Sequence, residues 1–128
     1  MDDCYIRRFV PLRAVDGDTL ETLRVDLGFH QAAVDDIRFR LYGINCPEKN
    51  KPATRAAGLA AMRYTQAWLS EHLHGGQYLV CRTLPVPGVA LQDSFGRYIA
   101  LVFCMQTEHV SLNKALLDAG HAVPFMLL

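Results

Sequence analysis

Apolar and polar residues alternate over three segments in the first third of the chain. Residues 5–15 mix apolar and basic side chains, residues 19–26 alternate in part, and residues 36–44 alternate clearly. A period of two places successive side chains on opposite faces of a strand, so these segments are predicted to be strands, the third one half-buried. Its polar face carries Arg38 and Arg40, which therefore point away from the predicted core.

Two later segments show helical spacing instead. Thr54 can cap a helix that runs to about Leu73 before a pair of glycines ends it. The apolar face of this helix is predicted from its spacing to consist of Ala57, Ala60, Ala61, Tyr64, Ala67 and Trp68. Ser111 can cap a shorter helix that runs to Ala119.

Two further strands are predicted at residues 77–84 and 97–104, and the second is apolar enough to be well buried. The order along the chain is then three strands, a long helix, two strands and a short helix. This order favours a mainly β fold, a five-stranded OB-fold barrel with one long helix after strand 3 and a short helix after strand 5. Such a barrel closes on itself and leaves few open strand edges.

Length and charge limit the classes of function. A chain of 128 residues suits a single domain, residues 1–128, with one core. Lysine and arginine total 13, as do aspartate and glutamate, so no long-range basic field exists to coat duplex nucleic acid non-specifically. A short phosphate contact at a local arginine cluster stays compatible with this balance.

The cysteines and the apolar runs indicate the redox environment and the cellular location of the protein. Reduced, mostly buried thiols are favoured over a zinc site or a disulfide framework, because no Cys-x-x-Cys pair links the four cysteines, Cys4, Cys46, Cys81 and Cys104. No apolar run approaches the roughly 20 residues that span a bilayer, so no membrane partner is expected. Residues 1–10 lack the long apolar segment of a secretory signal, so we expect a cytoplasmic protein unless a signal has been removed.

Asp16, Gly17 and Asp18 form a strong turn signal between the first two predicted strands. Two carboxylates beside a glycine turn offer hard oxygen ligands to Ca²⁺ or Mg²⁺. Asp-Gly turns are common, however, and a simple hairpin turn explains this segment as well.

Two segments that contain an arginine could contact a phosphate. Arg40 is followed by a turn that carries Glu48 back toward it; an arginine fork suits phosphate, and a carboxylate in reach could orient or deprotonate water. In residues 93–97, Gly96 permits a close approach just before Arg97, whose side chain can point into a cleft. Taken singly, the two segments are also explained by a surface salt bridge and by a solvated arginine.

The three segments together supply what phosphodiester hydrolysis needs. The reaction requires a cation on the phosphate oxygens, a placed water and positive charge around the transition state. We hypothesise that Glu48 activates water, that Arg40 and Arg97 hold the phosphoryl oxygens, and that Asp18 anchors the cation.

In this order the motifs resemble the staphylococcal nuclease (thermonuclease) family. They are Asp-Gly-Asp-Thr at residues 16–19, Arg-Leu-x-Gly-Ile-x-x-Pro-Glu at residues 40–48 and Asp-x-x-Gly-Arg at residues 93–97. Residues 111–122 also resemble the second helix of that family, and the resemblance extends over about residues 12–123. Each motif alone is modest, but three in order at suitable spacing are specific.

The resemblance implies an OB barrel with Ca²⁺-dependent nuclease activity, a phosphodiesterase that acts on DNA and RNA, prefers single strands and leaves 3′-phosphate ends. It assigns the catalytic roles to Arg40, Glu48 and Arg97. It assigns Ca²⁺, or another divalent cation, to oxygen donors of Asp18, Asn45, the backbone carbonyl of Cys46 and, in the outer shell, Asp16.

Several residues depart from the pattern of that family. Asn45 stands where the family has aspartate, and since calcium affinity rises with ligand charge, weaker metal binding is expected. Cys46 replaces a threonine, which matters little if only its main-chain oxygen binds metal. Phe95 replaces a tyrosine, so it can stack on a base but cannot hydrogen-bond. Together with Tyr42 and Tyr98, it is a candidate for substrate contacts.

Two other functions stay open at this point. An OB barrel can hold single-stranded nucleic acid without cutting it, but few aromatic platforms and no net positive charge argue against this here. A protein-interaction domain that kept the fold is supported only by the apolar tail at residues 123–128, which is costly to leave in water. The expected partners are therefore single-stranded DNA or RNA, and the expected state is a monomer or a weak dimer formed through this tail.

Overall fold

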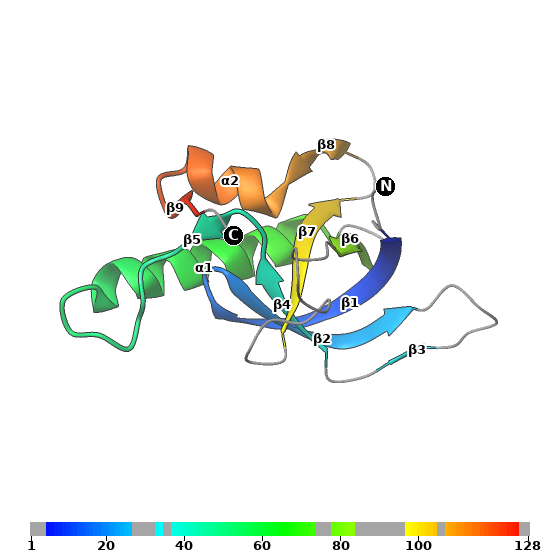
Figure 1. Ribbon diagram of the computed structural model, residues 1–128, viewed down its shortest axis with the longest axis horizontal. Coiled ribbons are helices and arrows are strands. Elements are labelled where there is room, and N and C mark those ends of the chain that lie inside the picture. Colours follow the sequence, from blue (N-terminus) through cyan, green and yellow to red (C-terminus); the bar gives the residue numbers. More distant parts are fainter. Residues whose placement is uncertain are drawn as a thin grey trace.

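A ring of strands forms the centre of the structure, a computed structural model that describes residues 5–26, 33–34, 37–73, 78–83, 97–104 and 107–125. The strands of the ring are β1 (Tyr5–Asp16), β2 (Thr19–Asp26), β4 (Arg38–Leu41), β6 (Leu79–Thr83) and β7 (Tyr98–Cys104). They pair in the order β1–β6–β7–β4–β2, and β2 pairs back onto β1, so the sheet closes (Figure 1). Every pair is antiparallel except β4 with β7, which is parallel.

The length of β1 allows the ring to close. Its first half pairs with β6 and its second half with β2, and the two registers meet at Phe9. The register shifts on both sides of Pro11, where a missing N–H and a bulge let the strand bend. Pro11, which weakens this segment as a regular strand, is thus the place where the strand turns from one partner to the other.

Short strands add to the ring. β3 (Ala33–Val34) pairs antiparallel with β2, and β8 (Thr107–Ser111) pairs antiparallel with β7. β5 (Ile44–Asn45) pairs with β9 (Val123–Pro124), which fastens the described part of the apolar tail beside the turn that follows β4.

The two helices lie outside the ring, and α1 (Arg55–Glu71) runs across one side of it (Figure 1). α2 (Leu112–Asp118) contacts both α1 and β7. Buried side chains from the ring strands and from both helices form a hydrophobic cluster, in which Phe9 and Phe39 meet edge to face with their ring centres 5.2 Å apart. The mainly β, OB-like fold predicted from the sequence is confirmed.

The predicted apolar face of α1 was only partly correct. The helix buries Gly58, Ala61, Thr65, Trp68 and Leu69, whereas Ala57 and Ala67 are exposed. Alanine fits either face of a helix, so its position carries little information. Burial of the polar Thr65 is possible because its hydroxyl donates to the backbone of the β1–β2 turn.

The two predicted helix caps behave differently. The Ser111 side chain accepts a hydrogen bond from the Lys114 N–H at 3.0 Å, as expected of a cap. Thr54 occupies the cap position of α1, but its side chain makes no capping bond. The Thr54 hydroxyl instead donates to the carbonyl of Glu48 at 2.6 Å, so it ties the preceding loop together.

The third predicted strand also ends earlier than expected. β4 stops at Leu41, and Gly43 takes a left-handed φ of 76° that turns the chain into β5. Within β4 the alternation is as predicted, because Phe39 and Leu41 are buried while Arg38 is exposed. The turn at Gly43 brings the segment after it under the β1–β2 turn.

Candidate active site

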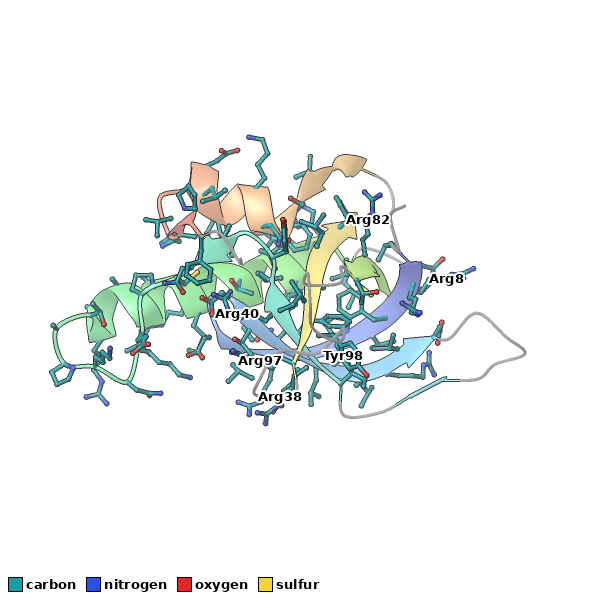
Figure 2. The ribbon with its side chains drawn as sticks, in the orientation of Figure 1. Arg8, Arg38, Arg40, Arg82, Arg97 and Tyr98 are labelled. Atoms are coloured by element: carbon teal, nitrogen blue, oxygen red, sulfur yellow. The ribbon has the colours of Figure 1, made fainter. Side chains whose placement is uncertain are left out.

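A cleft of about 390 Å³ lies where the β1–β2 turn, the segment after β4, the loop before α1 and the start of β7 meet. Every predicted catalytic and metal-binding residue lines it: Asp16, Asp18, Arg40, Asn45, Cys46, Glu48 and Arg97. Figure 2 shows Arg40 and Arg97 on the same side of the molecule, away from Arg8 and Arg82. Three segments that are far apart in the sequence therefore meet in one place.

The β1–β2 turn is held in place by contacts from two directions. The Asp18 carbonyl accepts from the Leu41 N–H at 2.9 Å, and the Gly17 carbonyl accepts from the Thr65 hydroxyl of α1 at 2.6 Å. A Cβ at Gly17 would lie 2.7 Å from the Cβ of Ala61 and 2.8 Å from the sulfur of Cys46. Glycine is therefore required here by the close approach of the helix and of the segment after β4.

Arg40 is largely buried and contacts two of the predicted metal ligands. Its Nη1 lies 3.4 Å from Oδ2 of Asp18, and its Nη2 donates to Oδ1 of Asn45 at 3.1 Å. Nη1 also donates to the carbonyl of Leu41 at 3.0 Å, so the guanidinium is fixed from several sides. Arg38, two residues earlier on the same strand, instead pairs with Glu21 outside the cleft at 2.8 Å.

Asp18 connects the turn to the segment after β4. Its Oδ2 accepts from the Cys46 N–H at 2.8 Å, which places the carboxylate directly beside that backbone. Burial, together with the negative charge of Asp18, raises the pKa of the Cys46 thiol to about 12. Without a bound metal ion, the thiol therefore stays protonated at neutral pH.

Glu48 stands on the rim of the cleft in the loop before α1. Its side chain is 63% exposed, and Oε2 lies 3.2 Å from Nζ of Lys51. The loop beneath it is packed tightly on α1, because a Cβ at Gly58 would lie 2.5 Å from the backbone nitrogen of Lys49 and 2.8 Å from the carbonyl carbon of Glu48. An exposed carboxylate on a backbone that is packed in this way can meet water without losing its position.

Arg97 reaches the cleft from the start of β7. Its Nη1 donates to the Thr19 hydroxyl at 3.3 Å, just beyond the β1–β2 turn. Of the predicted substrate contacts, Tyr42 is 43% exposed, whereas Tyr98 is partly buried against the core (Figure 2). Phe95 lies outside the described residues.

A family model described as "Staphylococcal nuclease homologue" matches residues 38–126 of the chain. The chain belongs to the staphylococcal nuclease family. The match covers Arg40, Glu48 and Arg97 and begins after the β1–β2 turn. No individual curated protein is similar enough to this chain to count as a match.

The members of this nuclease family generally depend on Ca²⁺. Among the described residues, no group of three or more His, Cys, Asp or Glu side chains could hold a metal ion. The cleft does bring together residues that carry hard oxygen donors, because Asn45 and Cys46 line it together with Asp16 and Asp18. The carboxylate and amide oxygens of Asp16, Asp18 and Asn45 fit Ca²⁺ or Mg²⁺ in chemical type, although two carboxylates give the set little negative charge.

Three residues of this family member have positions that the sequence motifs did not reveal. Lys49 lines the cleft, and its ammonium donates to the Val15 carbonyl at 2.5 Å. Gly58 and Thr65 lie on α1 and hold the loop and the turn, respectively. The contacts of Lys49 with Val15 and of Thr65 with Gly17 join residues 34 and 48 positions apart, so the motifs do not reveal them. Only the spacing of Gly58 and Thr65 on the helix could have hinted at these two residues.

The described part of the apolar tail folds back onto the β4–β5 turn. The Phe125 N–H donates to the Gly43 carbonyl at 2.8 Å, and the Phe125 ring centre lies 6.0 Å from Cζ of Arg40. Val123 stays 61% exposed. Among the described residues, no helix is long and apolar enough to cross a membrane.

Proposed function

We propose that this protein is a Ca²⁺-dependent nuclease that hydrolyses phosphodiester bonds of single-stranded DNA or RNA. The proposal is carried by one observation: Arg40 and Glu48, from residues 40–48, and Arg97, from the start of β7, line a single cleft together with a set of hard oxygen donors. Membership of the staphylococcal nuclease family supports the same reaction class.

In the proposed reaction Glu48 is the general base. Its exposed carboxylate takes a proton from water, and the water oxygen then attacks the phosphorus atom. The bond from phosphorus to the 5′ oxygen breaks, and that oxygen takes a proton from solvent, which leaves a 3′-phosphate and a 5′-hydroxyl. Arg40 and Arg97 donate to the phosphoryl oxygens, whose negative charge increases as the water attacks.

The cation in this proposal would be held by oxygens of Asp18, Asn45 and the backbone of Cys46, with Asp16 farther out. When bound, Ca²⁺ would supply positive charge next to the phosphate oxygens. Asn45 contributes no charge of its own, and its Oδ1 already accepts from Arg40, so both features favour weak binding of the cation.

A preference for single strands agrees with the charge and shape of the molecule. The chain has no net charge to attract a duplex, and a cleft of about 390 Å³ suits one nucleotide better than two paired strands. The exposed ring of Tyr42 at the β4–β5 turn is a candidate surface for a base to stack on.

The decisive experiment compares the parent protein with Glu48→Gln on single-stranded DNA, single-stranded RNA and duplex DNA, with Ca²⁺ and with a chelator. Calcium-dependent cleavage should fall by roughly 10²–10⁴-fold in the variant, the usual contribution of a general base. Glu71→Gln changes an exposed glutamate at the end of α1 and is the matched control, with activity expected to be unchanged.

Two results would contradict the proposal. Full activity of Glu48→Gln in Ca²⁺ would remove Glu48 from the role of base. Binding of a single strand by the parent protein, without cleavage in any divalent cation, would show that the cleft holds nucleic acid but does not cut it.

A further inference from the structure

Lys49 occupies a position in the cleft to which no role has been given. Its Nζ donates to the carbonyl of Val15 at 2.5 Å and lies 3.9 Å from Oδ1 of Asp16, with Sδ of Met62 at 3.5 Å. The side chain is 25% exposed, in contrast to 70% for Lys51 in the same loop. The ammonium of Lys49 is thus held against the β1–β2 turn and does not simply extend into solvent.

This contact completes a pattern of charge pairing at the turn. Asp18 is paired with Arg40 and Asp16 with Lys49, so each carboxylate of the turn has a cation from another segment beside it. Among the residues that the structure describes, three acidic and three basic side chains line the cleft: Asp16, Asp18, Glu48, Arg40, Lys49 and Arg97. The formal charges of these six side chains therefore balance before any metal ion enters.

A divalent cation that enters this cleft meets the positive charge of Lys49 as well as the negative charge of the carboxylates. Calcium sites reach high affinity by gathering carboxylates, and a fixed ammonium beside one of them works in the opposite direction. The ammonium cannot leave the cleft without breaking its hydrogen bond to the Val15 carbonyl. Its departure would therefore cost free energy, because the carbonyl would lose this donor.

We propose that Lys49 is a positioning residue that acts as a built-in cation of the cleft, fixing Asp16 and holding down the affinity for a divalent cation. This inference rests on the cation site of the proposed function. It adds a determinant of affinity that is separate from Asn45, because Lys49 acts through Asp16 whereas Asn45 changes a ligand.

The test is the dissociation constant of Ca²⁺, measured by calorimetry on the parent protein, Lys49→Met, Lys49→Arg and the control Lys114→Met. Lys114 is an exposed lysine on α2 that pairs with Asp118, away from the cleft. Lys49→Met should bind Ca²⁺ roughly three- to tenfold more tightly, the size expected when one unit charge near a divalent cation is removed in a mostly aqueous setting. Lys49→Arg and Lys114→Met should bind as the parent does, and the gain should shrink at high salt.

A purely structural lysine would give the opposite result, because loosening the turn would weaken Ca²⁺ binding. Equal or weaker binding by Lys49→Met, with the melting temperature measured alongside, therefore overturns the inference; Lys49→Gln repeats the test should the Met variant fail to fold.

Asn45→Asp separates this inference from the proposed function. If Asn45→Asp binds Ca²⁺ and the double variant with Lys49→Met binds no tighter, the role of Lys49 is wrong while the cation site stands. If neither the parent nor any of these variants binds Ca²⁺, the cation site and the inference both fall.

Discussion

Gly58 lets α1 support the loop that carries Glu48, and replacing it with alanine should separate activity from stability. An added Cβ would lie 2.5 Å from the nitrogen and 2.6 Å from the Cα of Lys49, whereas ordinary contact begins at 3.4 Å. The obstructing atoms are backbone, so no side-chain rotation can relieve the clash. The loop must therefore move as a unit, and Glu48 moves with it.

Opposing terms set the effect of Gly58→Ala on stability. Alanine stabilises a helix relative to glycine by about 0.8–1 kcal/mol. Overpacking costs about 1–3 kcal/mol. The net change in the free energy of unfolding should thus lie between about zero and a loss of 2 kcal/mol, or a fall in melting temperature of up to roughly 8 °C. The site is affected more strongly, because a shift of about 1 Å at a catalytic group can cost 10²-fold in rate.

The assay pairs kcat on a single-stranded oligonucleotide in saturating Ca²⁺ with thermal melting of the same samples. Ala67→Gly is the matched control, since this exposed position on α1 should lose about 1 kcal/mol of stability with kcat unchanged. The reasoning would be refuted if Gly58→Ala were more stable by the full amount of about 0.8–1 kcal/mol that alanine adds to a helix and also kept its kcat. The loop would then have room for the methyl group.

Two further predictions concern the frame around the cleft. Asn113 is buried and donates from Nδ2 to the carbonyls of Tyr42 and Ala100 at 2.9 and 3.1 Å, while its Oδ1 accepts from the Val102 N–H at 3.1 Å. Asn113→Ala removes a donor from the Tyr42 carbonyl and the side-chain acceptor of the Val102 N–H, whereas the Ala100 carbonyl keeps the Tyr42 N–H as a donor at 2.8 Å. The variant should lose about 2–5 kcal/mol in urea denaturation; a loss under about 1 kcal/mol would mean that water replaces the amide. Burial raises the pKa of the Cys81 thiol from its ordinary 9.0 to about 12, so the folded protein keeps a proton that the unfolded chain releases. The stability from this thiol is complete below pH 9 and is lost as pH rises toward 12, by up to about 1.4 kcal/mol per pH unit. Because the pKa of Cys46 is also raised to about 12, Cys81→Ala should remove only its own part of the slope in a denaturation series. An unchanged slope would contradict the assignment.

The parts of the fold that follow from local rules were predictable. Alternation placed Phe39 and Leu41 inside and Arg38 outside, and the Ser111 cap formed as expected because a capping bond spans only three residues. Thr54 shows the limit of such rules. Its hydroxyl could accept a capping bond from α1, but it makes none and donates to the Glu48 carbonyl of the preceding loop.

The candidate site was predictable as a set of residues but not as a geometry. Motif spacing named Asp18, Arg40 and Glu48, and all three line one cleft. What the spacing could not give is how the segments approach one another. Gly58 and Lys49 matter through contacts between α1, the loop and β1, and such contacts depend on packing between segments that share no sequence pattern.

The contacts of Arg40 and Lys49 explain what Asn45 changes where the family has aspartate. An aspartate there would face Arg40 together with Asp18, and the guanidinium would hold two carboxylates. With Asn45 the same nitrogen donates to a neutral amide, so Arg40 is bound less firmly while the cleft keeps its charge balance with Lys49 in place. Because Arg40 is held less firmly, less energy is needed to turn it toward a phosphate. This gain in phosphate binding offsets part of the loss in cation binding that the missing carboxylate causes. Arg40, Lys49 and Asn45 are therefore energetically coupled. The effect of changing one of them on Ca²⁺ affinity should depend on whether the others have been changed.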